Sequence, residues 1–316
     1  MTTVALFGSW ESMPEADALR AALPDDRFVV AGDDLGPAAE AEAAFGGFSV
    51  ERIRQALAGL PRLRWMHTFS AGVDRHVPAL AGRQDILLTN NSGAYDIPIA
   101  EHVIAMLFGA AKALPAHLAA QGRREWKRDV PHRELRDATL VVVGLGSIGG
   151  EIARLAHGLG MRVIGVRRDP RRPVPGVERI VPPEELAAVA AEADHLVVSA
   201  ALTPETRGLV SAAVLARLRP TAWLVNIARG PIVDEAALVA ALREGRIGGA
   251  ALDVFDTEPL PAESPLWSLP NVILTPHVSG SSPRVRERSL ALVVENLRRF
   301  KAGEPLLNLV DRAAGY

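Results

Sequence analysis

The stretch Leu140-Val-Val-Val-Gly-Leu-Gly-Ser-Ile-Gly149 decides the fold of this 316-residue chain. A β-branched run, typical of a buried strand, passes into a Gly-x-Gly-x-x-Gly sequence and then into a helical pattern, which is the order of elements in a dinucleotide site. Gly144 would let the chain turn off the strand, Gly146 would leave room for a pyrophosphate, and Gly149 would let the helix pack close to the sheet. The unpaired N–H groups at the start of that helix would then face the phosphates.

The residues that follow the glycines support this interpretation. The glycine spacing alone is weak evidence, because a chain with 27 glycines could contain it by chance in a turn with a purely structural role. An apolar stripe with helical spacing comes next, at Ile148, Ile152, Leu155, Ala156 and Leu159. Residues 161–166, Met-Arg-Val-Ile-Gly-Val, then read as the next strand and complete a βαβ unit.

Two arginines follow this second strand, at the place where a carboxylate normally binds the ribose 2′-OH of NAD. A guanidinium can pair with the 2′-phosphate that a carboxylate would repel, so Arg167 and Arg168 predict NADP(H), with NAD(H) possible at lower efficiency. The alternative is a solvated basic turn, since Arg171 and Arg172 follow closely.

The composition excludes several other classes of protein. The net charge of −2 gives no electrostatic basis for binding nucleic acid or an anionic membrane. The chain has no cysteine, which excludes disulfides, thiolate catalysis and cysteine metal sites, and we expect no metal ion. The N-terminus lacks a signal-peptide pattern, and no run of 18 apolar residues occurs. We therefore expect a soluble, cytoplasmic protein.

Strand and helix patterns alternate in two series, which predicts parallel sheets with helices on both faces. In the first series, strands are expected at residues 4–7, 63–67 and 86–89, with one helix capped by Ser12 and a second capped by Ser49. In the second series, strands are expected at residues 140–143, 161–166, 195–199, 222–227, 250–254 and 272–275, the six of a complete dinucleotide fold.

Two further helices connect the series. A long one has apolar residues at Ile99, Val103, Met106, Leu107, Ala110 and Leu114. The last one, with Leu290, Val293, Val294 and Leu297, is expected to return to the first domain. The predicted fold class is α/β with two doubly wound parallel-sheet domains. These are a Rossmann dinucleotide-binding domain at residues 98–283 and a smaller, flavodoxin-like substrate domain at residues 1–97 plus 284–316, with a ligand expected in the cleft between them.

Three polar segments lie where strands of the second series should end: Asn226-Ile-Ala-Arg-Gly230, Asp253-Val-Phe-Asp-Thr-Glu-Pro259 and Thr275-Pro-His-Val-Ser-Gly280. Ligands of open α/β sheets bind outside the carboxyl ends of the strands, so Arg229, Glu258 and His277 could converge beside the nicotinamide. An arginine can hold a carboxylate and polarise a carbonyl, a histidine can pass a proton, and a glutamate can fix the histidine tautomer. Taken singly, each could instead be structural: a turn, a solvated loop and a capped strand end.

These segments and the glycine motif resemble the D-isomer-specific 2-hydroxyacid dehydrogenase family. The resemblance covers most of the chain and includes Ser70-Ala-Gly-Val-Asp74, Asn91-Ser-Gly, Ile99-Ala-Glu-His102 and Leu202-Thr-Pro-Glu-Thr206. It implies that His277 is the acid/base that protonates the 2-oxo oxygen, that Glu258 is its partner and that Arg229 binds the substrate. It also implies cofactor contacts from Gly144, Gly146, Ser147, Ile148, Gly149, Thr203, Pro204, Ala228, Asp253 and Ser279, besides the two arginines.

The family resemblance further implies that the backbone N–H groups of Ala71, Gly72 and Val73 take the substrate carboxylate. The alternative for this segment is an ordinary strand-to-helix turn capped by Asp74. One departure from the family pattern is Ser199-Ala-Ala201, which stands where the family often has His-x-Pro. The resemblance also implies a homodimer, with the helix from Ile99 and its flanking segment as the interface, unless its apolar stripe packs only within the subunit.

The short first domain and the expected NADP preference resemble the glyoxylate/hydroxypyruvate reductase branch, which implies reduction of a small 2-oxoacid to the D-2-hydroxyacid. A larger substrate such as phenylpyruvate stays open, because Phe45, Phe48, Trp65 and Tyr95 could line a side-chain pocket or belong to the core. The alternative from another class is a dinucleotide-sensing binding protein, like the transcriptional corepressors that share this fold. Glu258 argues against a formate dehydrogenase, whose family pattern has glutamine at this position.

Overall fold

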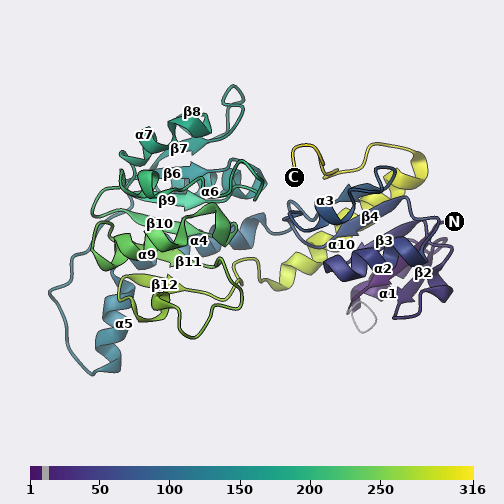
Figure 1. Cartoon of the computed structure of the whole chain (residues 1–316), viewed down its shortest axis with the longest axis horizontal. Coiled ribbons are helices and arrows are strands. Elements are labelled where there is room, and N and C mark those ends of the chain that lie inside the picture. The colour runs from purple at the N-terminus through teal and green to yellow at the C-terminus, as the bar shows by residue number, and fades with distance from the viewer. Residues whose placement is uncertain (9–13) are drawn as a thin grey trace. The chain divides into compact units, whose positions relative to one another are not determined.

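The computed structural model describes residues 1–8 and 14–316, which form two compact units. The first unit comprises Met1–Tyr95 and Ser282–Tyr316, and the second comprises Asp96–Ser281 (Figure 1). The expected junctions, after residue 97 and before residue 284, each lie two residues away from these. The cap predicted at Ser12 lies outside the described residues.

In the described part of the first unit, five parallel strands form one sheet in the order β2-β1-β3-β4-β5, which is the flavodoxin order. The strands are β1 (Thr3–Phe7), β2 (Arg27–Ala31), β3 (Ala43–Gly46), β4 (Trp65–Thr68) and β5 (Leu87–Thr89). The sequence analysis was wrong to leave out β2 and β3. The last residue of β3 is a glycine because the strand runs close to β1 there: a Cβ on Gly46 would lie 2.3 Å from the carbonyl oxygen of Phe7.

The helices of the first unit cover this sheet. They are α1 (Pro14–Ala22), the short η2 (Gly36–Ala38), α2 (Val50–Gly59), α3 (His76–Ala79) and α10 (Pro283–Ala302). Ser49 caps α2 as expected, because its Oγ accepts the Arg52 N–H at 3.1 Å. Val293 and Leu297 of α10 pack into a core cluster with Phe45 and Trp65. Phe48 is buried in the second core cluster of this unit, so these three aromatic side chains are core residues.

In the described part of the second unit, seven parallel strands form one sheet in the order β12-β11-β10-β9-β6-β7-β8, which Figure 1 shows. The strands are β6 (Thr139–Val143), β7 (Arg162–Val166), β8 (Arg179–Val181), β9 (His195–Val198), β10 (Trp223–Asn226), β11 (Gly249–Leu252) and β12 (Val272–Leu274). The helices are α4 (Asp96–Ala111), α5 (Leu114–Gly122), α6 (Ser147–Gly158), α7 (Leu186–Ala190), α8 (Ala212–Leu215), α9 (Glu235–Arg243) and the short η3 (Pro183–Glu185), η4 (Gly230–Ile232) and η5 (Pro265–Ser268). The sequence analysis missed β8, a three-residue edge strand that begins with an exposed arginine. The predicted α/β class with two parallel-sheet domains is confirmed.

The long helix expected from Ile99 is broken in two. Ala113 has a left-handed φ of 50°, and α4 and α5 meet at an angle of 69°. Leu114 therefore begins α5 instead of ending α4, and its side chain is exposed. Among the described residues, no single helix has the length and apolar character to cross a membrane, and only the bent pair α4 and α5 meets those two criteria jointly.

The strand order of the second unit divides the carboxyl edge of its sheet into two parts. The chain moves outward from β6 to β7 and β8, then returns to β9 on the other side of β6, which creates a topological switch point. The glycine motif follows β6 at this point, and Thr203 follows the adjacent β9. Arg229, Glu258 and His277 follow β10, β11 and β12, which are three neighbouring strands.

Candidate active site

The glycine motif forms a tight turn between β6 and α6. Gly144 has φ +95°, and a Cβ on it would lie 2.5 Å from the Ala200 nitrogen. A Cβ on Gly149 would lie 1.9 Å from the Gly144 carbonyl oxygen, so both glycines are required by packing within the protein. Gly146 differs, because a Cβ on it would meet no heavy atom within 4 Å. The absence of a side chain there keeps open the space in front of the α6 N-terminus, which fits a bound dinucleotide pyrophosphate.

Ser199 takes part in this turn. Its hydroxyl donates to the Gly144 carbonyl at 2.7 Å. The departure from the family pattern at Ser199-Ala-Ala201 therefore places small residues against the glycine turn, and one of them holds the turn by a hydrogen bond.

The residues expected to meet the adenosine end lie after β7 and β9. The Nε of Arg167 donates to the Asp169 carbonyl at 2.7 Å, which directs its guanidinium into the local turn. Thr203 Oγ1 donates to Glu205 Oε2 at 2.7 Å and lowers the pKa of Glu205, and the charge of Arg168 adds a smaller lowering. Arg168 thus lies within electrostatic reach of the turn that carries Thr203 and Pro204.

His277 and Glu258 form a pair. His277 Nδ1 lies 2.7 Å from Glu258 Oε2, and the other carboxylate oxygen, Oε1, accepts the Phe255 N–H at 3.0 Å. An ionised carboxylate only accepts hydrogen bonds, so Nδ1 carries the proton of this hydrogen bond and Nε2 is the ring nitrogen outside the pair. The two side chains are 47 % and 31 % exposed, so the pair contributes little to stability and its main effect is on the orientation of the ring.

His277 is held by its backbone as well as by its ring. It has a left-handed φ of 53°, a conformation that non-glycine residues adopt rarely and that often occurs at functional sites. Its N–H donates to the Asp253 carbonyl at 2.8 Å.

Asp253 organises the loop that carries His277. Its side chain is 1 % exposed, and its carboxylate accepts three hydrogen bonds: Oδ1 from the Thr275 hydroxyl at 2.6 Å and the Val278 N–H at 2.9 Å, and Oδ2 from the Ser279 N–H at 2.9 Å. A buried carboxylate that accepts several donors fixes the segments that supply them. The main structural effect of Asp253 is therefore to fix residues 275–279, and the Ser279 N–H belongs to this arrangement.

His102 of α4 extends this arrangement. Its Nε2 lies 3.3 Å from Thr275 Oγ1. Because the Thr275 hydroxyl donates to Asp253, the proton between His102 and Thr275 belongs to Nε2. Burial lowers the pKa of His102, with the charge of Asp253 opposing that shift, so a neutral ring at neutral pH matches this pattern.

Arg229 lies directly after β10, between β9 and β11 in the sheet order. Its carbonyl accepts the Asn226 side-chain amide at 3.1 Å, and one guanidinium nitrogen donates to the Ala228 carbonyl at 2.8 Å. A Cβ on the next residue, Gly230, would lie 2.0 Å from the Phe255 carbonyl carbon. The Arg229 turn is thus packed backbone to backbone against the segment that leads to Glu258.

The expected substrate loop, Ala71 to Val73, belongs to the first unit, where it follows β4. Helix α3 begins after it, with Arg75 at the N-cap position. The structure therefore brings Glu258 and His277 into contact, places Arg229 on the neighbouring strand, and carries the loop on the other unit.

Together, the parallel sheet with a dinucleotide turn at its switch point and the imidazole–carboxylate pair beyond it define a class, the nicotinamide-dependent oxidoreductases. Residues 104–279, more than half of the chain, match the model of the D-isomer specific 2-hydroxyacid dehydrogenase, NAD binding domain. The chain belongs to the D-isomer-specific 2-hydroxyacid dehydrogenase family, as its motifs predicted. It is an NAD(P)-dependent oxidoreductase acting on 2-oxoacids.

Relatives and solved structures agree with this assignment. Glyoxylate reductase of Korarchaeum cryptofilum is 37 % identical over 262 residues, which cover 80 % of this chain and 77 % of that protein. Glyoxylate reductase of Aeropyrum pernix is 36 % identical over 290 residues, covering 88 % and 85 %. A family member from Xanthobacter autotrophicus in complex with NADPH and MES has a TM-score of 0.86 at 35 % identity and full coverage of both chains. The NADPH-dependent glyoxylate/hydroxypyruvate reductase from Sinorhizobium meliloti, bound to NADP and sulfate, has a TM-score of 0.85 at 31 % identity, again over both whole chains.

The sequence analysis quoted Thr275 and His102 only as parts of motifs and gave neither a role. Their signal was present, since each lies in a motif next to residues expected to function. Their hydrogen bonds to the Asp253 group became visible only when the structure showed α4 beside β12.

Proposed function

We propose that this protein reduces a small 2-oxoacid of the glyoxylate or hydroxypyruvate type to the D-2-hydroxyacid with NADPH. The observation that carries the proposal is the 2.7 Å pair of His277 and Glu258 on a loop fixed by Asp253. The relatives named glyoxylate reductase support the small substrate. Burial of Phe45, Phe48 and Trp65 in the cores of the first unit supports it too, because it leaves fewer aromatic side chains for a large pocket.

In this mechanism, the substrate carboxylate is bound by Arg229 and by the backbone N–H groups of Ala71, Gly72 and Val73. Arg229 also polarises the adjacent carbonyl. A dinucleotide held at the turn of Gly144, Gly146 and Gly149 would supply the hydride for the carbonyl carbon. His277 gives its Nε2 proton to the carbonyl oxygen, which becomes the hydroxyl group of the product. Glu258 stabilises the imidazolium before the transfer and keeps Nδ1 protonated after it, so the ring needs no rotation between turnovers.

The test is an assay of NADPH oxidation with glyoxylate, hydroxypyruvate, pyruvate and phenylpyruvate. We expect turnover with the first two, and His277→Ala should lower it by a factor on the order of 10² to 10⁴ while NADPH affinity stays nearly unchanged. His157→Ala, which removes an exposed imidazole from α6, is the matched control and should retain full turnover. Activity confined to phenylpyruvate would reassign the substrate. Binding of NADPH without turnover of any of the four would indicate a dinucleotide sensor.

We further propose that Arg168, which is more exposed than Arg167, makes the main contact with a 2′-phosphate. Replacing a guanidinium that pairs with phosphate costs roughly 1.5 to 3 kcal/mol, which is about a 10- to 150-fold change. Arg168→Ala should therefore lower the ratio of kcat/KM for NADPH to that for NADH by at least about tenfold, and Arg167→Ala should lower it less. An unchanged ratio in both variants would contradict NADP recognition by these arginines.

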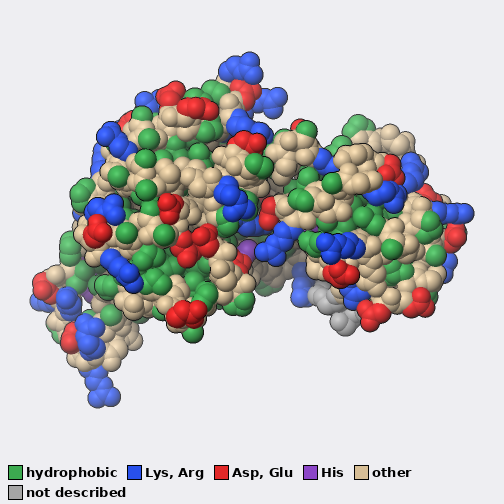
Figure 2. Space-filling view, in the orientation of Figure 1, with side chains coloured by type: hydrophobic (Ala, Val, Ile, Leu, Met, Phe, Trp, Pro, Cys, Tyr) green, Lys and Arg blue, Asp and Glu red, His purple; other side chains and the backbone are tan. Residues whose placement is uncertain are grey.

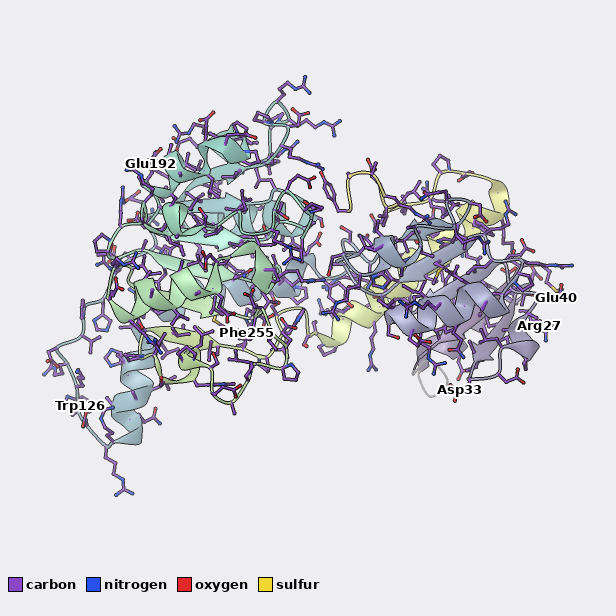
Figure 3. The ribbon with its side chains drawn as sticks, in the orientation of Figure 1. Arg27, Asp33, Glu40, Trp126, Glu192 and Phe255 are labelled. Carbon is purple, nitrogen blue, oxygen red and sulfur yellow. The ribbon has the colours of Figure 1, made fainter. Side chains whose placement is uncertain are left out.

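We also propose that the protein is a homodimer joined through α5 and the segment that follows it. This region exposes several large apolar side chains, including Leu118 at 56 % and Trp126 at 91 %. Figure 3 shows Trp126 on the segment beyond α5. On the face drawn in Figure 2, acidic and basic side chains are interspersed, so single-sign charge does not dominate that face. Light scattering should give twice the chain mass, and Leu118→Ser with Trp126→Ser should shift it toward the monomer.

A further inference from the structure

Three consecutive carbonyl groups of the loop after β4 are all held by the segment after β5. The Tyr95 hydroxyl donates to the Phe69 carbonyl at 2.6 Å, the Asn91 backbone N–H donates to the Ser70 carbonyl at 3.1 Å, and the Asn90 side-chain amide donates to the Ala71 carbonyl at 2.9 Å. The two segments meet because β4 and β5 are neighbouring parallel strands. We call these three hydrogen bonds the carbonyl clamp.

The carbonyl clamp determines where the N–H groups of the loop point. A trans peptide is planar, so the C=O of one residue and the N–H of the next point in opposite directions. Holding the Ser70 carbonyl therefore aims the Ala71 N–H away from the clamp, and holding the Ala71 carbonyl does the same for the Gly72 N–H. Among the residues that the structure describes, neither N–H group has an acceptor.

The Phe69 carbonyl plays a different part, because the N–H in its peptide belongs to Ser70. That N–H already donates to Thr68 Oγ1, at 3.3 Å. Tyr95 therefore fixes the start of the loop, whereas Asn90 acts on one of the two N–H groups that are left for a ligand.

Asn90 is itself fixed, which makes it an effective anchor. Its Oδ1 accepts the Ser92 N–H at 3.1 Å, so the same amide group points its nitrogen at Ala71. Its backbone N–H donates to the Asn308 carbonyl at 3.2 Å, and the Asn308 amide donates to the Ser92 carbonyl at 2.7 Å. Asn308 of the C-terminal segment thus holds the backbone of Asn90 and Ser92 in place.

We propose that Asn90 and Tyr95 are positioning residues for the loop that receives the substrate carboxylate. Asn90 aims the Gly72 N–H at that carboxylate, and Tyr95 fixes the start of the loop, while the Asn91 backbone N–H orients the peptide that carries the Ala71 N–H. The inference rests on the proposed function, in which this loop receives that carboxylate. It gives the Tyr95 hydroxyl a structural partner instead of a direct contact with substrate. It also predicts a graded response: loss of the Asn90 amide has a larger effect than loss of the Tyr95 hydroxyl.

The experiment compares Asn90→Ser and Tyr95→Phe with the unmodified protein. Serine can keep the local turn to Ser92 but is too short to reach Ala71, and phenylalanine keeps the ring of Tyr95. Asn271→Ser is the matched control, because Asn271 makes the same type of bond, to the Leu242 carbonyl at 3.3 Å, in the other unit. The measurements are KM and kcat with glyoxylate, and the Kd of oxalate, a dicarboxylate probe, for the NADPH-bound protein by calorimetry.

A net hydrogen bond corresponds to roughly a 2- to 13-fold change in binding. We expect KM and the oxalate Kd to rise about tenfold in Asn90→Ser and about threefold in Tyr95→Phe, with smaller changes in kcat, because binding is weakened equally in the ground state and the transition state. Values for Asn90→Ser within twofold of Asn271→Ser would overturn the proposal. So would a fall in kcat and NADPH affinity with KM unchanged, because that pattern indicates general structural damage.

Failure of the proposed function has a separate signature. If the unmodified protein turns over none of the four 2-oxoacids but binds oxalate, the proposed function is wrong, and the oxalate Kd of the variants alone supports or overturns the carbonyl clamp. If the unmodified protein does not bind oxalate, the loop does not receive a carboxylate and the clamp proposal is overturned.

Discussion

Replacing Thr275 by valine removes one hydroxyl group from the loop that carries His277 and keeps the shape of the side chain. That hydroxyl lies between two partners: it donates to Asp253 Oδ1 at 2.6 Å, and it lies 3.3 Å from His102 Nε2. Without it, Asp253 keeps the N–H groups of Val278 and Ser279 but loses its short contact with the residue at the start of the loop. We expect the backbone around His277, which has a left-handed φ of 53°, to lose part of its restraint.

The magnitude follows from the type of hydrogen bond. An O–H donor at 2.6 Å from a carboxylate lies in the range of charge-assisted hydrogen bonds, which contribute roughly 1.5 to 3 kcal/mol. If the whole of this hydrogen-bond free energy stabilised the transition state, its loss would lower kcat/KM by about 10- to 150-fold. Because two of the three donors to the Asp253 carboxylate remain, we expect the lower end, a fall of about tenfold.

The assay is steady-state reduction of glyoxylate, with NADPH affinity measured separately by fluorescence titration. Thr275→Ser retains the hydroxyl and is the matched control, so it should stay within about threefold of the unmodified protein. NADPH affinity should change little in both variants. If Thr275→Val and Thr275→Ser have the same kcat/KM, the hydroxyl does not position His277, and the role given to the Asp253 group is wrong.

Three further predictions concern the glycine turn and a buried histidine. Gly146→Val should weaken NADPH binding at least about tenfold at unchanged Tm, because a Cβ at this position faces open space. Normal affinity by fluorescence titration would contradict binding of the pyrophosphate in front of Gly146. Gly149→Ala should instead lower Tm, because its Cβ would lie 1.9 Å from the Gly144 carbonyl oxygen, and an unchanged melting curve would refute this packing. Burial lowers the pKa of His67 to about 3, whereas in the unfolded chain this histidine binds a proton near pH 6.5. The contribution of neutral His67 to the stability of the first unit is therefore complete above about pH 6.5. Below that pH, the free energy of unfolding should fall toward pH 3 by on the order of 1.4 kcal/mol per pH unit. His67→Asn, which can keep the hydrogen bond to Thr89, should flatten that slope in urea unfolding at pH 7, 6 and 5, and an equal slope would count against it.

The dinucleotide turn could be predicted because its physical causes are local. Gly144, Gly146 and Gly149 act within one strand-turn-helix, and their packing and spacing are confined to about ten residues of sequence. The α/β class followed from the alternation of strand and helix patterns over the whole chain. His277 and Glu258 were predicted as a pair because ligand-binding residues of such sheets follow the strands.

The rest depended on contacts between distant residues. β3 is Ala-Ala-Phe-Gly, so its small residues give no β-branched signal, and β8 has only three residues. The helix break at Ala113 is the exception, because Pro115 lies in the first turn of α5 and a proline inside a helical pattern ends or kinks the helix before it. The sequence analysis did not use this signal. The carbonyl clamp joins Asn90 to Ala71 across 19 positions, and it depends on β4 lying beside β5 in the sheet.

The carbonyl clamp and the hydrogen bonds of Asp253 have the same kind of arrangement but differ in the strength of their hydrogen bonds. In each, loops at the carboxyl ends of adjacent parallel strands are joined by side chains, β4 to β5 by Asn90 and Tyr95, and β11 to β12 by Asp253. The first group uses neutral donors and carbonyls, whereas the second uses a buried carboxylate, whose hydrogen bonds are roughly twice as strong. The first should therefore affect mainly KM, through the carboxylate that the loop binds, and the second should affect kcat/KM, through the orientation of His277. The two groups belong to different sheets and share no hydrogen bond, so a change in one should leave the hydrogen bonds of the other intact and each loop can be altered separately.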